Sequence, residues 1–370
     1  MQFAISAPET GPGKGLSEAM RYLLHLLEAI LAVNLLVLVH EMGHLLVARL
    51  FRVPSLKFSI GLGPRLFGIK FKGTEYSLAS VPIGGFVQLA QGHDHDSGTS
   101  CMDCVSPWKR ILIYFAGPAA NLLFVVLLFW LVYSVIGYRD HEPVVAVVEP
   151  ESPAALAGIE PEDRILQVNG KRVITWSQLV LAFETDGRGP VTLVVQRRGR
   201  QEGSGTEDSQ ATLFVSLSPQ AHESLGIRPA EQMIRLRLGP AHAIRKSLNK
   251  LWLVSGLLAD SLIGLVTAKV SPSELVGPIY LFHLSSQAAS AGPAALVYLL
   301  AFISASLFFF NLLPLPLLDG GQILLTFLQR VLNRPLGDRS LRLLMHASLF
   351  WLLLILASAT LNDLVRLLAS

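Results

Sequence analysis

Long apolar runs dominate the pattern of hydrophobic and polar positions along the chain. A helix needs about 20 mostly apolar residues to cross the hydrocarbon core of a bilayer. Four runs meet this requirement and predict membrane-spanning helices at residues 22–50, 111–136, 294–317 and 341–368. A fifth run, 251–266, is shorter and contains Asp260. We expect residues 241–268 to form an amphipathic helix at the membrane interface, with a fifth span as the alternative.

The link between the first two spans has a different periodicity. Residues 57–89 alternate in polarity, carry β-branched and aromatic side chains, and are interrupted by glycines. This pattern predicts a small sheet of β-hairpins. Because an open strand edge cannot face lipid, we expect the sheet to pack on protein or to line a wet cavity.

A segment with the pattern of a soluble α/β domain follows the second span. Strand-like runs at 144–149 and 191–198 flank a helix-like run at 177–185. The chain is therefore divided into a flexible polar leader (1–20), a first membrane half (21–140), this domain (141–220), a linker with the interfacial helix (221–292) and a second membrane half (293–370).

The composition supports a membrane protein and excludes one class of partner. Hydrophobic residues make up 51% of the 370 residues and charged residues only 15%. Soluble domains are about a quarter charged. The net charge of +3 is weak, and no basic cluster with interleaved aromatic residues occurs, so we expect no nucleic-acid binding.

Basic residues in the short links between spans set the expected orientation. The link at 50–110 contains Arg52, Lys57, Arg65, Lys70, Lys72, Lys109 and Arg110, and the link before the last span contains Arg330, Arg334 and Arg339. We therefore expect both links in the cytoplasm and residues 141–220 on the opposite side of the membrane.

The first span contains the string HEMGH, which gives His40, Glu41 and His44. Two histidines at i and i+4 lie on one helix face, so both rings can reach one metal ion, and Glu41 can act as general base on a metal-bound water. Ionisable residues inside a span are costly and rare. The alternative is that these residues only pair with another helix, which leaves that cost without a reason.

A catalytic zinc site usually has three protein ligands and one open position. The candidate third ligand is Asp319, which follows His44 by 275 residues (319 − 44) and comes directly after the third span. Pro314 and Pro316 interrupt that helix, which is tolerated at membrane depth where the break lines a protein cavity. From spacing and depth alone, a zinc ligand and a helix-capping aspartate before Gly320 are equally good interpretations.

A second cluster of candidate ligands lies in the 50–110 link. His93, His95, Cys101 and Cys104 could hold a second metal, although their spacing is not that of a standard zinc finger. The neighbouring aspartates and glycine favour the alternative of a solvated loop. We expect no disulfide in a cytoplasmic link.

The pair of strings HExxH in the first span and NxxPxPxLDG in a later one resembles the site-2 protease family of intramembrane metalloproteases. Residues 73–89 resemble the membrane-associated β-region of the family, 115–123 its GPxxN motif, and 273–281 the segment before its third core span. The strings SPAALAGI and DRILQVNG within 141–220 resemble a PDZ domain. The most similar group is the bacterial regulator-of-sigma-E-type proteases, here with a single PDZ domain.

This resemblance implies both a fold and a metal site. The fold is a multi-pass α-helical membrane protein with four core transmembrane helices, a membrane-associated β-region and one inserted PDZ-like α/β domain. By the resemblance, His40, His44 and Asp319 bind one catalytic Zn²⁺, and Glu41 is the base.

The same resemblance and the helix break imply a set of supporting residues. Asn311 would help to hold the substrate or the oxyanion, and Asn121 would support the active-site region. Pro314 belongs to the break. We expect residues 73–89 to present a strand edge to which an extended substrate adds, with Gly84 and Gly85 bending that edge near the metal.

The implied function is hydrolysis of peptide bonds in or near the transmembrane segments of single-pass membrane proteins. Such regulated proteolysis would act on substrates such as an anti-sigma factor or remnant signal peptides, trimmed first by another protease. The implied location is the bacterial inner membrane, with the active site toward the cytoplasm and the PDZ domain outside, as a peptide binder or a size filter. The alternatives are a non-catalytic PDZ membrane scaffold and a transporter, although a transporter predicts inverted repeats and none is found.

Overall fold

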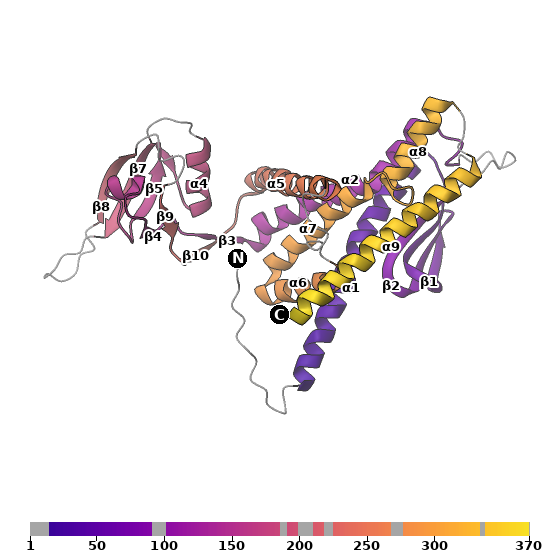
Figure 1. The fold of residues 1–370 in the computed structure, drawn as a ribbon, viewed down its shortest axis with the longest axis horizontal. Helices are drawn as coiled ribbons and strands as arrows, with labels where there is room; N and C mark the ends of the chain where they lie inside the picture. The colour runs from indigo at the N-terminus through magenta and orange to yellow at the C-terminus, as the bar shows by residue number, and fades with distance from the viewer. Residues whose placement is uncertain are drawn as a thin grey trace. The chain divides into compact units, whose positions relative to one another are not determined.

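The computed structural model describes residues 15–90, 101–185, 191–198, 210–217, 225–267, 277–333 and 337–369. These residues form two compact units (Figure 1). The described parts of residues 1–136 and 239–370 form the first, the membrane unit, and Gly137–Leu238 contain the second, the inserted unit.

The membrane unit consists mainly of long helices. They are α1 (Gly15–Leu50), α2 (Pro107–Leu131) with its continuation η1 (Val132–Ile136), α5 (Pro240–Val266), α6 (Pro278–Ala291), α7 (Pro293–Asn311), α8 (Asp319–Leu332) and α9 (Asp338–Ala369). Among the described residues, four helical stretches are long and apolar enough to cross a membrane: Ile30–Leu50, Pro107–Ile136, Pro293–Asn311 and Arg339–Arg366. The prediction of four such helices is confirmed.

The N-terminal boundary of the first helix differs from the prediction. Helix α1 begins at Gly15, so the assignment of residues 15–20 to a flexible leader is wrong. The run LSEAM that follows Gly15 consists mostly of good helix formers, which extend the helix beyond its apolar part. Residues 1–14, the rest of the predicted leader, lie outside the described range.

The third span is shorter than predicted. Helix α7 ends at Asn311 rather than near residue 317. Pro314 and Pro316 follow, and a proline both lacks the N–H that a helix needs and clashes with the preceding turn. The predicted helix break is therefore present, and it starts earlier than the apolar run suggests.

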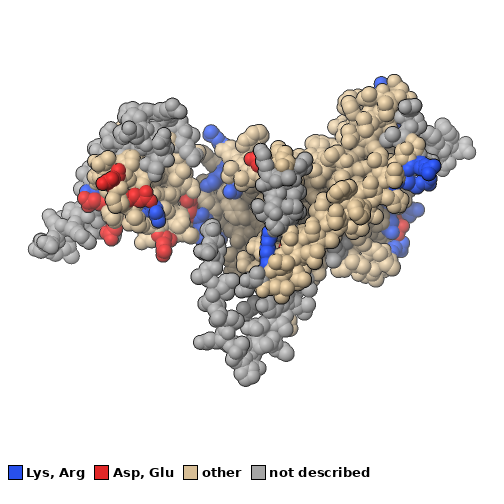
Figure 2. Space-filling model, in the orientation of Figure 1, with Lys and Arg blue, Asp and Glu red and all other residues tan. Residues whose placement is uncertain are grey.

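Helix α5 confirms the helix predicted at residues 241–268. It packs against α2 and α7 and leaves large apolar side chains exposed, including Trp252 at 84% and Leu257 at 58%. Its location at a membrane interface stays a prediction. Figure 2 shows that uncharged residues cover most of the visible face of the membrane unit, which suits a surface in contact with lipid.

Helix α2 is central in the membrane unit, because it packs against α1, α5, α7 and α8. Its residues Val125 and Phe129 are buried. At Gly43, α1 comes so close that an added Cβ would lie 2.3 Å from the carbonyl oxygen of Ala116. Small residues at such contacts allow membrane helices to approach closely. This contact holds the HExxH turn of α1 directly against α2.

The predicted β-sheet is confirmed as strands β1 (Ser55–Phe71) and β2 (Thr74–Leu89). Both long strands bend, so parts of β1 and β2 pair with each other in more than one place. Ser59 pairs with Phe86 on one side and with Ser77 on the other, while residues 62–71 pair with 74–81. The sheet therefore runs in the order 62–71, 74–81, 55–60, 85–89.

This order corrects part of the prediction about the strand edge. Residues 75–78 pair with the chain on both sides, so they are in the interior of the sheet and cannot present an edge. The segment 85–89 is an outer strand. The sequence could not distinguish these cases, because the fold-back of β1 at residues 60–62 decides which segment has two neighbours.

The inserted unit is a small α/β structure. An antiparallel sheet contains, in this order, β6 (Lys171–Arg172), β5 (Arg164–Val168), β7 (Val191–Arg198) and β8 (Gln210–Leu217). Two further strand pairs are β4 (Val145–Val148) with β9 (Ile227–Pro229) and β3 (Tyr138–His141) with β10 (Met233–Leu236). The helices are α3 (Pro153–Leu156) and α4 (Trp176–Thr185). Val145, Ile165, Leu179 and Leu193 are buried in its core. The unit is wider than the predicted 141–220, because β9 and β10 pair with β4 and β3.

Candidate metal centre

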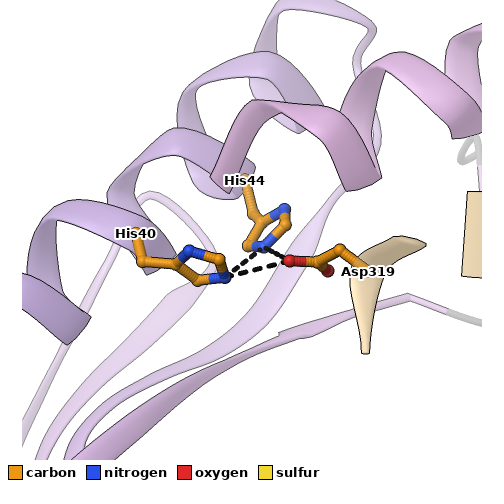
Figure 3. A group of neighbouring side chains, drawn as sticks. All are labelled: His40, His44 and Asp319. Atoms are coloured by element: carbon orange, nitrogen blue, oxygen red, sulfur yellow. Dashed lines mark hydrogen bonds and ion pairs between the residues drawn. The ribbon is translucent and has the colours of Figure 1, made fainter. Parts of the chain in front are cut away.

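Helix α1 supplies three residues of the site within little more than one turn. His40, Glu41 and His44 lie in the part of α1 that packs against α2. His44 is 9% exposed. The histidines are at i and i+4, so their rings project from the same helix face toward one point, as Figure 3 shows.

The break between α7 and α8 positions Asp319. Helix α8 begins at Asp319, next to its N-cap residue Leu318, so the carboxylate lies at a helix N-terminus. The glycines that follow allow this turn to close tightly. An added Cβ would lie 2.2 Å from the carbonyl oxygen of Leu312 at Gly320, and 2.1 Å from that of Leu315 at Gly321. Helix α8 packs against α2, and this contact brings Asp319 to the histidines.

The three side chains meet with the spacing of a zinc site (Figure 3). His40 Nε2 lies 3.0 Å from Asp319 Oδ2, His44 Nε2 lies 3.4 Å from the same oxygen, and the two Nε2 atoms are 3.2 Å apart. Around a tetrahedral zinc ion with bonds of about 2.0–2.1 Å, neighbouring ligand atoms are about 3.3 Å apart. The donor set of two imidazoles and one carboxylate therefore fits a single Zn²⁺.

The other ring nitrogen of His44 fixes its tautomer. His44 Nδ1 lies 2.7 Å from the carbonyl oxygen of Ile113 on α2. Because a carbonyl only accepts, Nδ1 must carry the proton and donate it. Nε2 is then left with its lone pair, which is the form that binds a metal.

Asn121 of α2 makes the equivalent contact to His40. Its Nδ2 lies 3.3 Å from His40 Nδ1, while its Oδ1 is buried without a hydrogen-bond partner. Exchanging the two amide atoms gives His40 Nδ1 an acceptor, because Oδ1 then accepts its proton. With that orientation, Nε2 of His40 also faces the metal position as a neutral ligand.

Glu41 is held by the outer strand of the β-sheet. The backbone N–H of Val87 donates a hydrogen bond of 2.9 Å to Glu41 Oε2. Sequence reasoning missed Val87, since a main-chain donor leaves no side-chain signal. The contact places the strand 85–89 directly beside the candidate base.

The sequence of the chain has counterparts among known proteins. Residues 28–355 match the model of the family described as Peptidase family M50. The chain belongs to peptidase family M50. Membership makes it a metalloendopeptidase of the site-2 protease type, and with its four apolar helices it is an integral membrane protein.

Relatives in this family match the chain over almost its whole length. A protein of Agrobacterium fabrum named "Putative zinc metalloprotease" is 30% identical over 353 residues, which cover 90% of this chain and 94% of the relative. A protein of the same description from Clostridium perfringens is 30% identical, with 92% and 99% covered. One from Campylobacter jejuni is 29% identical, with 93% and 94% covered.

Gly117 is a further residue at this M50 metal site that the sequence analysis did not single out. A Cβ at Gly117 would lie 2.2 Å from His44 Nε2 and 2.8 Å from His40 Nε2. On the side of α2 that faces the two histidines, position 117 therefore has no room for a side chain. The available signal was the GPxxN string, of which only Asn121 was selected.

The other four predicted support residues lie in the break between α7 and α8 or beside Glu41. Asn311 is the last residue of α7, and Pro314 lies in the break that leads to Asp319. Gly84 and Gly85 line a narrow crevice that Glu41 also lines. The structure thus brings the glycines near the candidate base and places Asn311 and Pro314 at the break.

The second metal site is not supported. The sulfurs of Cys101 and Cys104 are bonded to each other, so the expectation of no disulfide in this link is wrong. A sulfur in a disulfide is not available as a thiolate ligand for zinc. His93 and His95 lie outside the described residues. The two cysteines are three residues apart in the sequence, and their Cα atoms are 4.9 Å apart. They lie in one tight turn, in which the backbone N–H of Cys104 donates to the carbonyl oxygen of Cys101.

Proposed function

We propose that this chain is an intramembrane zinc protease that hydrolyses peptide bonds in or near the transmembrane segments of single-pass membrane proteins. The observation that carries the proposal is the convergence of His40, His44 and Asp319 at 3.0–3.4 Å. These residues come together among helices that are long and apolar enough to cross a membrane. A metal site among such helices suits cleavage inside a membrane.

In this proposal, each residue of the centre has one role. His40 and His44 bind Zn²⁺ through Nε2, and Asp319 binds it through a carboxylate oxygen. Bound zinc supplies Lewis acidity toward the scissile carbonyl and acidifies a coordinated water. Glu41 accepts the proton of the attacking water and passes it to the leaving amine.

Two asparagines support these groups in the proposal. Asn121 orients His40 by a hydrogen bond to Nδ1 of the histidine ring, and the buried position of Asn121 on α2 favours this role. Asn311 holds the substrate or the developing oxyanion from the end of α7, where Pro314 keeps the backbone out of a helix. Both are amide side chains, which can hydrogen-bond without adding charge to the membrane region.

The strand 85–89 is the proposed place for the substrate backbone. A peptide bond in a helix is hidden in its own hydrogen bonds, so the substrate must be extended before it is cut. An extended segment that adds to an outer strand is held by main-chain hydrogen bonds. Val87 supports this role, because its N–H points away from β1 toward Glu41.

The inserted unit is proposed to be PDZ-like and to act as a size filter for the substrate. A peptide binder of this class adds a strand to a sheet edge. In the inserted unit, helix α4 lies beside β3, and Ser177 Oγ donates to Asp140 Oδ1 at 3.0 Å. A peptide between α4 and β3 would have to break this bond, which favours the filter.

The filter predicts a specific behaviour of substrates. A single-pass protein with a bulky outer domain would be excluded until another protease trims it. Deletion of residues 137–238 should therefore allow cleavage of the untrimmed protein. If the deleted enzyme still cuts only the trimmed form, the unit is not a filter.

The proposed location is the bacterial inner membrane, with the site toward the cytoplasm. This orientation follows from the basic residues in the link at 50–110 and in the link before the last span. Figure 1 shows that the end of α8, the start of α9 and the strands β1 and β2 lie at the same end of the membrane unit. This shared end supports the proposal that both links lie on the cytoplasmic side of the bilayer.

Comparative membrane proteomics tests the proposal. Cells with the active enzyme are compared with cells that carry Glu41→Gln. Single-pass membrane proteins, such as an anti-sigma factor or remnant signal peptides, should accumulate in the variant as uncut fragments. Identical membrane proteomes would contradict the proposal and favour a non-catalytic scaffold.

A further inference from the structure

Asn34 is a polar residue of the first span that the mechanism above does not use. It lies in the apolar stretch Ile30–Leu50 of α1, seven residues before Glu41 (41 − 34 = 7). Seven residues are about two helical turns, so Asn34 and Glu41 lie on the same face of α1. A polar side chain at such a position needs partners, because lipid offers none.

The partners of Asn34 are two backbone carbonyls. Its Nδ2 donates to the carbonyl oxygen of Ile30, one turn earlier in α1, at 2.7 Å and to the carbonyl oxygen of Pro82 in β2 at 2.5 Å. Its Oδ1 is buried and has no hydrogen-bond partner among the residues that the structure describes. Because both neighbours only accept hydrogen bonds, the NH₂ group must face them, and the orientation of the amide is settled.

Asn34 and Glu41 therefore tie the same helix face to the same strand. Asn34 contacts β2 at Pro82, and Glu41 contacts β2 at Val87, within the segment 85–89. The narrow crevice lined by Glu41, Gly84 and Gly85 lies between these two contacts and is also lined by Asn34 and Val37. Gly85 is close enough to α1 that an added Cβ would lie 3.4 Å from Val37 Cγ1, and 2.7 Å from the carbonyl oxygen of Ser59 behind it.

The two ties have different roles in the proposed reaction. A substrate strand that adds to 85–89 needs the N–H of Val87, so substrate binding would replace the contact of Glu41 with this N–H. Asn34 lies two turns away from the metal ligands and takes no part in proton transfer. Its bond to Pro82 is the polar contact that can persist while the substrate is bound.

We propose that Asn34 is a positioning residue that sets the strand 85–89 against the metal and thereby selects which peptide bond is cut. The inference rests on the proposed function. Consecutive residues of an extended substrate are spaced by about 3.3 Å, so a shift of the strand by one residue presents a different peptide bond. Pro82 lies only three residues before the strand 85–89, so its bond to Asn34 limits how far that strand can move along α1. Gly84, with φ +85°, bends the chain between Pro82 and the strand.

The test uses the full-length chain in phospholipid vesicles. The substrate is a soluble carrier fused to one leucine-rich transmembrane helix of about 20 residues with a central pair of glycines, which weaken the helix. Zinc content, kcat, KM and the masses of the cleavage products are measured. Asn34→Leu removes the donor, while Leu35→Ala is the control, because Leu35 is 41% exposed on the outside of α1.

Asn34→Leu should keep its zinc and its melting temperature and should cut at several neighbouring bonds. The value of kcat/KM for the principal bond should fall about tenfold, which is the loss expected for one hydrogen bond. Asn34→Gln keeps the donor and should restore a principal cut. Gly84→Ala should spread the cuts in the same way, and the double variant Asn34→Leu with Gly84→Ala should be no worse than the poorer single variant.

Several outcomes would overturn the inference. A single cut at the wild-type bond with unchanged kcat/KM in Asn34→Leu would do so. Loss of zinc or of thermal stability in this variant would show a merely structural residue and would also overturn it. A wild-type enzyme that binds zinc but cuts no membrane substrate would instead contradict the proposed function.

Discussion

The backbone N–H of Val87 donates a hydrogen bond of 2.9 Å to Glu41 Oε2. One end of this bond is an outer β-strand, and the other end is the candidate base next to two histidines. In the proposed function, a substrate strand that adds at 85–89 would compete with Glu41 for this donor.

Glu41→Gln should keep the metal and lose cleavage. The amide oxygen of glutamine can still accept from Val87, so the local structure is retained, but a neutral amide cannot take a proton from water. General base catalysis contributes about 10²–10⁴-fold, and we expect kcat to fall by about 10³ or more. Metal analysis and a cleavage assay on the same purified sample give both values. Cleavage at the wild-type rate would exclude Glu41 as the base.

Asp319→Ala should lose both zinc and cleavage. Two imidazoles alone leave the ion with too few protein ligands for a catalytic zinc site. The loss is measured as zinc per protein after dialysis, and His40→Ala should behave in the same way. Asp260→Ala is the matched control, since Asp260 lies on the exposed face of α5. An Asp319→Ala protein with a full complement of zinc would show that the carboxylate is not a zinc ligand.

Gly117→Ala should weaken metal binding although it adds one methyl group. The new Cβ would lie 2.2 Å from His44 Nε2, so the ring must move away from the metal position. We expect the zinc affinity to fall by at least about tenfold, as for other changes in the surroundings of a ligand. Competition with a chelator measures this affinity.

Gly256→Ala provides the control for that substitution. Gly256 lies on α5, and a Cβ there meets no atom within 4 Å. The same chemical change in an open helical position should be neutral or slightly stabilising. Equal zinc affinities in the two variants would refute the steric role of Gly117.

Arg197→Ala should destabilise the inserted unit. Arg197 donates to both carboxylate oxygens of Asp163, at 2.8 and 2.7 Å, and Asp163 is 1% exposed. The hydrogen bond to Asp163 raises the pKa of Arg197, so the guanidinium stays charged. Removing the guanidinium leaves a buried carboxylate without its partner, which costs about 3 kcal/mol.

Hydrogen exchange in β5 and β7 of the full-length protein measures this change. Arg228→Ala is the matched control, because Arg228 and its partner Glu149 have exposed side chains, at 69% and 47%. An exposed pair contributes about 0–1 kcal/mol. Equal protection in the two variants would show that Asp163 does not depend on Arg197.

The sequence alone determined the local features of this protein. The apolar runs gave the four membrane helices, and the spacing of His40 and His44 put both rings on one helix face. The prolines at 314 and 316 predicted the break in the third span, and alternation in 57–89 predicted the β-sheet. These features follow from the repeat of a helix or strand and from the missing N–H of proline, which act over a few residues.

Only the tertiary structure decided how distant parts of the site meet. The packing of α8 on α2 brings Asp319 within 3.0 Å of His40, and from spacing alone a ligand and a cap were equal choices for this residue. The fold-back of β1 made 85–89 an outer strand and buried 75–78 between neighbours. The main-chain donor of Val87 leaves no side-chain signal, and the GPxxN string does not show that a side chain at Gly117 would collide with the histidines. Such contacts depend on which surfaces pack together, and no short-range pattern in the chain encodes that.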